Sequence, residues 1–461
     1  MFNVFLIANV SRFRRPRITV CHNRRLSTPS AGKTEVLRNP TSPYRQLRSG
    51  RPREVDFAHT LVQRGQFKEA LGELFINDKC ISQDQRIWTH LLRGISYEGL
   101  SDTPKALQAY EVACEVAGRH PHVDPCIAIE CFRRYCQTLH TMRSYDALLR
   151  AKRSLVHLLR IFSHNDPEQY RLVLAEELAG LATIHALHGD ASDGLRAAEE
   201  AEEVLNRIGM STGISSPLLL WLKVIDIRSI LHWALDEYER AICCNEKSIK
   251  KYREIIEKGR KDGTVDPQIE ERFAIALGRF ADQLRQMQNQ ASEVLSLYRH
   301  ALDVWVSLLK TSPQTRRHAE NLQMAALGYS AIEMDKKKAN EVLKVALDAI
   351  PDPFQDVRIP LLLEMSHISA EISGAGEPEA RRALHILDEW TGKSDSLPLK
   401  LRLAATTALS NSLSHLDRNE EAVESMKTTE EKVEAILTAN PTLADKPLLQ
   451  DLVEFIVLTS R

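Results

Sequence analysis

The sequence contains few of the residues that mark several common protein classes. Among its 461 residues only 6% are aromatic, and 19 Gly with 19 Pro make about 8% of the chain, against an average of about 12%. This composition excludes collagen-like, proline-rich and low-complexity architectures. No run approaches the roughly 18 to 20 apolar residues that a membrane-spanning helix requires. The sequence therefore predicts an ordered, soluble protein without a transmembrane segment.

Recognisable catalytic and metal-binding signatures are also missing. Cys126, Cys131 and Cys136 recur every five residues, which on a helix turns successive side chains by about 140° and disperses them around the axis. No His-Glu-x2-His run occurs. The run Gly32 to Thr34 lacks the first glycine and the preceding strand of a phosphate-binding loop. We therefore predict no catalytic residue, no cofactor and no metal, and we expect that the protein is not an enzyme.

Charge is distributed unevenly, although the whole chain carries a net charge of −1. Residues 1–53 contain eleven Arg, Lys33 and a single acid, Glu35, which gives this arm a net charge of +11. Residues 54–461 then hold 49 basic and 61 acidic side chains, for a net charge of −12. The two parts of the chain therefore need separate explanations.

Residues 1–53 form a basic arm that is rich in Arg and Ser and poor in acids, a composition typical of a mitochondrial transit peptide. Five prolines between Pro16 and Pro52 argue against a folded domain there. Two other interpretations stay open. One is a solvated, disordered arm, including one created by a start codon placed too far upstream, and the other is an arm that binds nucleic acid or lipid. The first interpretation predicts a mitochondrial location, and otherwise we expect a cytoplasmic one.

From Val55 onward the pattern changes to paired helices of about 12 to 18 residues, with apolar residues at the three-and-four spacing of amphipathic helices. No alternating run of convincing strand length appears. Residues 54–445 are predicted to form a helical repeat array. Residues 446–461 are predicted to form a capping helix that covers the apolar face of the last repeat.

The clearest repeat lies at residues 87–118. Its first helix reads Leu92-Arg93-Gly94-Ile95-Ser96-Tyr97, and its second contains Ala106, Tyr110 and Ala113. This pattern resembles the tetratricopeptide repeat (TPR), in which Leu-Gly-x2-Tyr on one helix is followed by Ala-x3-aromatic-x2-Ala on the next. Gly94 and Ala106 are expected to be small because the two helices approach closely there.

Eight further copies align on the small or apolar residue that corresponds to Ala106. The nine anchors stand at residues 70, 106, 148, 194, 241, 294, 339, 380 and 422, so most intervals exceed the 34 residues of an ordinary TPR. The longer repeat resembles kinesin-light-chain TPR arrays. The resemblance implies an all-α, right-handed α-solenoid of about nine TPR-like helical hairpins with a C-terminal capping helix.

The resemblance also implies a binding face. TPR arrays expose one stripe of each hairpin's first helix on a concave groove, which receives a peptide or a helix of another protein. Arg and amide side chains suit such contacts, and the residues predicted to contact a partner are Arg133, Arg279, Gln283, Asn321 and Asn411.

We therefore predict a non-enzymatic TPR scaffold or adaptor that binds a protein or peptide partner, located in mitochondria if the arm is a transit peptide. A regulatory or oligomerisation TPR module of a signalling system is the first alternative. A mitochondrial RNA-associated repeat protein is the second, and the net charge of −12 on the array argues against it, because nucleic-acid binding requires a positive groove.

Overall fold

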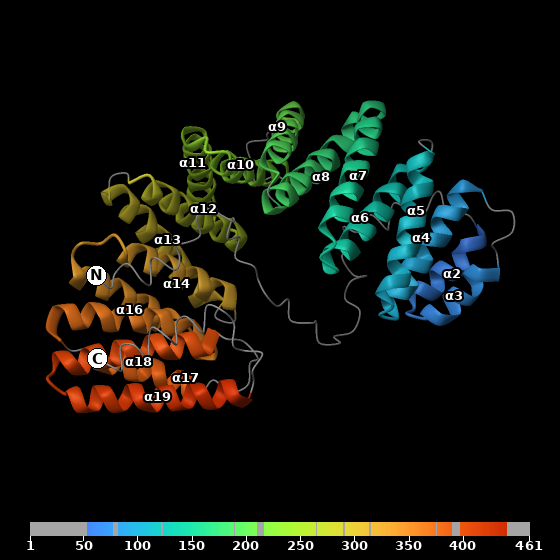
Figure 1. Ribbon diagram of the computed structural model, residues 1–461. Helices are drawn as coiled ribbons and strands as arrows, with labels where there is room; N and C mark the ends of the chain where they lie inside the picture. Colours follow the sequence, from blue (N-terminus) through green and yellow to red (C-terminus); the bar gives the residue numbers. More distant parts are fainter. Residues whose placement is uncertain are drawn as a thin grey trace. The chain divides into compact units, whose positions relative to one another are not determined.

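The structure is a computed structural model, and it describes residues 53–76, 82–120, 123–188, 190–209, 216–263, 265–288, 291–312, 315–374, 376–389 and 397–439. These residues form eighteen α-helices and one short 3-10 helix, with no strand in the described ranges (Figure 1). The predicted all-α fold is therefore confirmed. The predicted capping helix 446–461 and the basic arm, apart from Arg53, lie outside the described residues.

The chain divides into two compact units, here called unit 1, up to Asn245, and unit 2, from Glu246. Unit 1 contains the helices α2 Arg53–Gln63, α3 Phe67–Ile76, α4 Gln83–Gly99, α5 Thr103–Arg119, α6 Pro125–Thr141, α7 Tyr145–Asn165, α8 Pro167–His188, α9 Ala191–Ile208 and α10 Ser216–Ala234. Helix α11, Tyr238–Asp262, runs across the boundary.

Unit 2 continues in the same alternation of helices and short turns. It contains α12 Pro267–Gln286, α13 Ala291–Thr311, α14 Arg316–Ser330, α15 Lys336–Ala349, the 3-10 helix η2 Asp352–Phe354, α16 Gln355–Ser373, α17 Glu377–Glu389, α18 Leu397–His415 and α19 Asn419–Ala439. Pro267, Pro378 and Pro398 lie in the first turns of their helices, where the absence of a backbone N–H costs no intrahelical hydrogen bond.

The described helices pair into nine hairpins, from α2 with α3 to α18 with α19. All nine anchors predicted from the sequence lie on the second helix of a hairpin and are buried. Ala70, Ala241, Ala339 and Ala380, for example, have no exposed surface. The repeat register read from the sequence is therefore confirmed, because each small or apolar anchor is buried on the second helix of its hairpin.

Helix boundaries follow local hydrogen-bonding chemistry. Ser82 begins α4 with a capping box, in which its hydroxyl accepts from Gln85 N at 3.2 Å and its own N–H donates to Gln85 Oε1 at 2.8 Å. Asp102, Asp124 and Asp266 cap α5, α6 and α12 in the same sense, each carboxylate accepting a backbone N–H of the first turn. These side chains satisfy N–H groups that a helix start otherwise leaves without a partner.

One turn geometry recurs between the two helices of a hairpin. In five hairpins a backbone N–H donates to the carbonyl five residues earlier at 2.9–3.0 Å, for example from Asp102 to Tyr97 and from Glu237 to His232. The residue before each donor has a positive φ, which is the Schellman arrangement that ends a helix. Only Gly65 among the five is glycine; the others are Ser101, Arg143, Asp236 and Asp417. Four non-glycine residues therefore adopt a left-handed conformation that glycine would adopt with less strain.

Close approach of helices explains two glycines. A methyl group on Gly94 would overlap the ring of Tyr110, which is fully buried in the partner helix of the same hairpin. A methyl group on Gly328 of α14 would overlap Tyr298, which belongs to the preceding hairpin. The prediction that Gly94 is small because the paired helices approach closely is confirmed.

Candidate partner-binding face

The first helices of neighbouring hairpins contact one another directly, as α2 contacts α4 and α14 contacts α16. We call the surface built by α4, α6 and α8 the first-helix face of unit 1; its charged residues are Glu98, Glu130, Arg133, Arg134, Glu176 and Glu177. The corresponding surface of α12, α14 and α16 is the first-helix face of unit 2; the charged residues that pair on it include Glu271, Arg316, Arg317, Glu320, Asp356 and Glu364. The residues that the sequence predicts to contact a partner lie on α6, α12 and α14 of these faces, and on α18 outside them.

Ion pairs connect consecutive first helices across the face of unit 1. Arg134 of α6 reaches Glu98 of α4 at 3.2 Å and Glu130 of its own helix at 3.0 Å. Arg133 reaches forward to α8, with Nε 2.8 Å from Glu177 and Nη2 3.2 Å from Glu176. The two adjacent arginines therefore join α6 to the helices on both sides.

Glu177 is the most buried carboxylate of this face, with its side chain 7% exposed. It also accepts a hydrogen bond from Lys152, so α7 takes part in the cluster together with α6 and α8. Burial disfavours the charged form, but the Lys152 ammonium and the Arg133 guanidinium outweigh it and hold the pKa of Glu177 below its ordinary value. The same carboxylates raise the pKa of Arg133 against the effect of its own burial. Charge on both partners is therefore mutually stabilised.

The first-helix face of unit 2 also has ion pairs between consecutive first helices, but its arginines are more exposed than those of unit 1. Arg317 of α14 lies 3.3 Å from Glu271 of α12, and Arg316 reaches Asp356 of α16 at 2.5 Å. The Ser330 hydroxyl donates to Glu364 of α16 at 2.9 Å. The side chains of Arg316 and Arg317 remain 46% and 56% exposed, so solvent screens their pairs.

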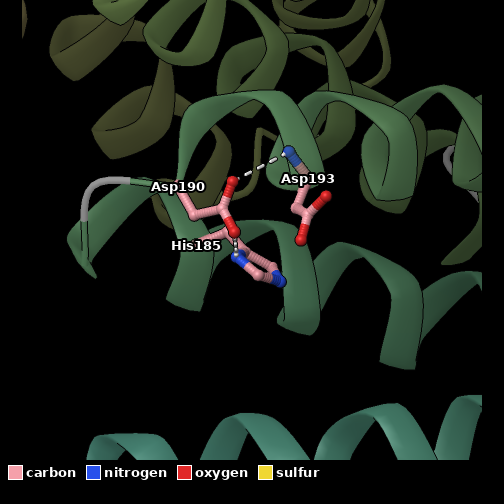
Figure 2. A group of neighbouring side chains, drawn as sticks. All are labelled: His185, Asp190 and Asp193. Carbon is pink, nitrogen blue, oxygen red and sulfur yellow. Dashed lines mark hydrogen bonds and ion pairs between the residues drawn. The ribbon is translucent and has the colours of Figure 1, made fainter.

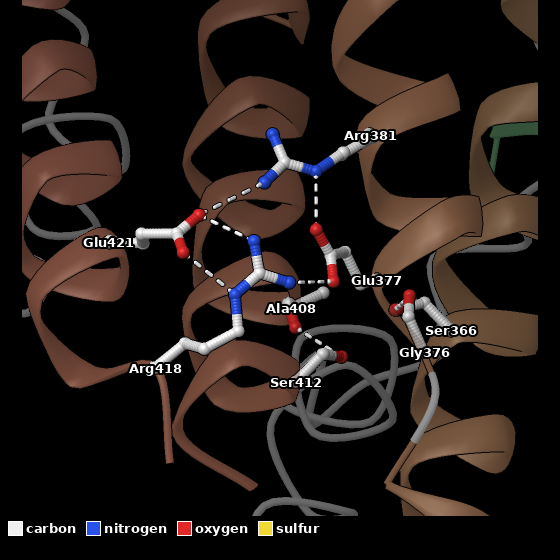
Figure 3. Close-up of polar contacts among 8 residues, drawn as sticks. All are labelled: Ser366, Gly376, Glu377, Arg381, Ala408, Ser412, Arg418 and Glu421. Atoms are coloured by element: carbon white, nitrogen blue, oxygen red, sulfur yellow. Dashed lines mark hydrogen bonds and ion pairs between the residues drawn. The ribbon is translucent and has the colours of Figure 1, made fainter. Parts of the chain in front are cut away.

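Second helices are also connected one repeat apart. In unit 2, Arg418 precedes α19 and donates to Glu377 of α17 at 2.6 Å and to Glu421 of α19 at 2.7 Å, while Arg381 joins Glu377 and Glu421 from the other side (Figure 3). Two arginines and two glutamates thus alternate across the junction of the last two hairpins.

The five predicted contact residues are placed differently by the structure. Arg133 lies in unit 1, half-buried and already ion-paired. Arg279 is half-buried on α12, and both it and Gln283 already interact within the protein. Gln283 is only 5% exposed, so a partner at the surface would not reach its side chain.

Asn321 is half-buried on α14, and its Nδ2 has no hydrogen-bond partner among the described residues. Asn411 is exposed on α18. Arg279 and Gln283 lie one turn apart on α12, whereas Asn321 and Asn411 lie on α14 and α18.

We call these ion pairs between consecutive first helices the charged ladder. They were not predicted, although they leave a signal in the sequence. The pairs are separated by 36 residues for Glu98 and Arg134, 44 for Arg133 and Glu177, and 40 for Arg316 and Asp356. These separations are close to the repeat length, because equivalent positions of neighbouring hairpins lie side by side. Opposite charges one repeat apart would have identified the pairs once the register was known.

A second polar cluster lies at the turn between α8 and α9. His185 is 1% exposed, and the ligand atoms of His185, Asp190 and Asp193 all lie within 4.8 Å of one another (Figure 2). Burial lowers the pKa of His185, which keeps its imidazole neutral at pH 7. The sequence analysis predicted no metal site and did not single out this spacing.

The six cysteines within the described residues are free thiols. Cys114, Cys131 and Cys136 are buried in α5 and α6, and burial raises the pKa of Cys136 to about 12. A thiol with so high a pKa is protonated at neutral pH and therefore a poor nucleophile. These residues act as small apolar side chains in the helix packing.

The described chain is a TPR-like helical repeat, as its nine antiparallel hairpins and their buried anchors show. No described helix is long and apolar enough to cross a membrane. No family model matches the sequence, and no curated protein matches it.

Solved helical-repeat structures resemble the chain in part. The C-terminal part of a TPR repeat-containing protein from Cytophaga hutchinsonii is 15% identical, with 67% of this chain and 99% of that chain covered and a TM-score of 0.41. The kinesin light chain-type, nearly identical TPR-like repeats of Podosopora anserina are 11% identical, with 49% and 100% covered and a TM-score of 0.36. Aspartyl phosphate phosphatase F from Bacillus subtilis is 12% identical, with 82% and 92% covered and a TM-score of 0.42.

Proposed function

We propose that the protein is a non-enzymatic scaffold that binds a peptide or a helix of a partner protein along the first-helix face of unit 1. The observation that carries this proposal is the ladder of charged side chains on consecutive first helices. Glu98 and Glu176 are exposed at the two ends of the ladder, and Arg133 is 34% exposed between them.

The exposed side chains of this face can form hydrogen bonds with a bound segment while the helices stay folded. Glu176 shares Arg133 with the buried Glu177, so Glu177 keeps the arginine in place when Glu176 accepts a donor of a bound segment. Glu98 likewise accepts from Tyr110 at 2.8 Å and from Arg134 at 3.2 Å, which leaves its remaining lone pairs for a donor of the partner. Polar contacts of this kind, repeated along successive hairpins, provide specificity for an extended or helical segment.

A matched pair of double variants tests this proposal. Glu98→Gln with Glu176→Gln removes two exposed charges from the first-helix face. Glu115→Gln with Glu203→Gln removes two exposed charges from the second helices α5 and α9, where each pairs with an arginine of its own helix. The tagged full chain would be recovered from its native cell after cross-linking.

We expect the first-helix variant to lose partners that the control retains, and we expect cross-links from those partners to map to α4, α6 and α8. Equal recovery by the two variants would overturn the proposal. Circular dichroism of both proteins checks that helix content is unchanged.

The basic arm extends the proposal to a location. We infer from its composition that residues 1–53 direct the protein to mitochondria. A chain that begins at Glu54 is the comparison, and import into isolated mitochondria is the measurement. Equal delivery of the two chains would show that the arm is not a transit peptide. The partner experiment does not depend on this result.

A further inference from the structure

Two neighbouring hairpins of unit 1 carry the same histidine at the same place. His185 lies in the last turn of α8 and His232 in the last turn of α10, 47 residues later, and each is 1% exposed. Each faces an acid five residues on, Asp190 and Glu237 respectively. The hairpins therefore supply an internal comparison of one buried imidazole in two settings.

In the later hairpin the ring nitrogen that faces the acid is hydrogen-bonded, whereas the buried Nε2 of His232 has no hydrogen-bond partner among the described residues. His232 Nδ1 and Glu237 Oε2 are 2.7 Å apart, a normal hydrogen bond. Arg240, three residues further on, donates to the same carboxylate oxygen at 3.3 Å. The His232 imidazole is therefore hydrogen-bonded to a carboxylate that a cation also binds.

The earlier hairpin differs at two of these points. His185 Nδ1 lies 3.6 Å from Asp190 Oδ2, beyond hydrogen-bond distance, and this buried nitrogen has no hydrogen-bond partner among the described residues. The position that corresponds to Arg240 holds Asp193, a second carboxylate. An unpartnered ring nitrogen and two carboxylates therefore converge on one point, as Figure 2 shows.

We propose that His185, Asp190 and Asp193 bind one zinc ion at the turn between α8 and α9. A neutral imidazole nitrogen and carboxylate oxygens are ligands that Zn²⁺ uses, at about 2.0 to 2.2 Å, with water completing a four-coordinate site. The gap of 3.6 Å suits two ligands of one such ion, and a ligand oxygen of Asp193 lies within 4.8 Å of both. The imidazole favours zinc over Mg²⁺ and Ca²⁺, which prefer oxygen ligands.

The surroundings of the three ligands are compatible with an ion. Asp190 Oδ1 accepts from Asp193 N at 3.3 Å and so keeps its other oxygen directed at His185. Arg153 of α7 lies 2.9 Å from Asp193 Oδ2. Arg196, which lies on α9 like Asp193, donates to Asp193 Oδ1. Each carboxylate oxygen has two lone pairs, so Arg153 can remain as an outer-shell partner. Arg196 is 78% exposed and can move into solvent.

The experiment uses the full chain after treatment with a chelator and dialysis. Calorimetric titration with Zn²⁺ measures stoichiometry and affinity, and Co²⁺ is the spectroscopic probe. We expect one Zn²⁺ per chain and a tetrahedral Co²⁺ spectrum without a thiolate charge-transfer band. Absence of stoichiometric Zn²⁺ binding, or a thiolate band that assigns the ion to cysteines, would overturn the proposal.

Variants assign the ion to the turn. His185→Gln and Asp193→Asn should each weaken Zn²⁺ binding by at least about tenfold, the smallest effect usual even for outer-shell partners. His232→Gln is the matched control at the equivalent position and should leave affinity unchanged. Arg196→Ala should strengthen binding, because it removes the exposed competitor for Asp193. If His185→Gln loses helix content, Asp193→Asn decides, since that side chain is 28% exposed; equal binding by Asp193→Asn and the wild type would refute the site.

Discussion

The two compact units connect neighbouring hairpins by the same device, opposite charges one repeat apart, but at different depths. In unit 1 the central acceptor, Glu177, is 7% exposed and lies between two cations. In unit 2 the acceptor of the pair, Asp356, is 16% exposed and its cation, Arg316, is 46% exposed. A buried pair fixes the relative position of its helices, because removing one partner leaves an isolated charge in a region of low polarity. A pair that solvent screens contributes little to stability. The same sequence pattern therefore has different energetic consequences in the two units.

The largest effect is expected from Glu177→Gln, which leaves Lys152 and Arg133 without their buried countercharge. Loss of one partner of a buried pair costs about 3 to 5 kcal/mol. The control in unit 2, Arg316→Ala, should cost at most about 1 kcal/mol. Hydrogen exchange monitored by mass spectrometry is the measurement, because it reports each unit separately. Similar losses of protection in α6–α8 and α14–α16 would remove the distinction between the units.

At close helix contacts we expect the reverse, a larger loss of stability from a substitution in unit 2 than from one in unit 1. A methyl group on Gly376 of unit 2 would overlap the Ser366 carbonyl oxygen and the Ser412 hydroxyl (Figure 3), and a backbone atom cannot rotate away. Gly376→Ala is therefore expected to cost about 3 kcal/mol, the upper part of the usual range for overpacking. Gly94→Ala in unit 1 meets the Tyr110 ring and should cost less, about 1 to 3 kcal/mol.

Gly278→Ala serves as the control for both glycines. Its added methyl group would meet nothing within 4 Å, and alanine favours a helix interior by about 1 kcal/mol. Thermal unfolding measured by circular dichroism should therefore place Gly278→Ala at or above the wild type. A similar destabilisation by all three substitutions would mean that the close contacts are not the cause.

Acid should weaken unit 1 through Glu177. Its pKa is lowered in the folded state from the ordinary value of 4.5, because the two cations favour the carboxylate over the acid. The stabilisation is therefore present above about pH 4.5 and is lost as the pH falls through the folded pKa. We expect the difference in stability between the wild type and Glu177→Gln to shrink as the pH falls below that value. A constant difference from pH 7 to pH 3 would contradict this.

The smallest effect concerns the hairpin turns. Ser101 in unit 1 and Gln288 in unit 2 have φ of 61° and 54°, a conformation that glycine adopts with less strain. Ser101→Gly and Gln288→Gly should each stabilise the protein by about 1 kcal/mol or less. Gly65→Ala, at φ 75°, is the reverse substitution and should destabilise it by a similar amount. Chemical denaturation gives the three values, and a gain from Gly65→Ala would exclude turn strain as the cause.

Much of the fold could be predicted because each hairpin repeats the same packing problem. A small or apolar side chain, such as Ala70, Ala106 or Leu148, is buried on each second helix, and this regularity identified nine hairpins at their observed positions. The candidate face was predicted less well. Gln283 occupies a first helix as expected but is buried, because helical periodicity indicates which residues share a side of a helix and not how closely the next hairpin covers that side.

The sequence by itself determined the helices, their pairing and their register, since apolar spacing, capping residues and small anchors act within a hairpin or between adjacent ones. The tertiary structure decided which charges meet. Arg133 and Glu177 are 44 residues apart, and only the stacking of hairpins brings their atoms to 2.8 Å. It also decided that His232 Nδ1 is hydrogen-bonded to Glu237, whereas His185 Nδ1 lies 3.6 Å from Asp190. Differences of about 1 Å between equivalent positions depend on the packing of neighbouring helices, which no single repeat specifies.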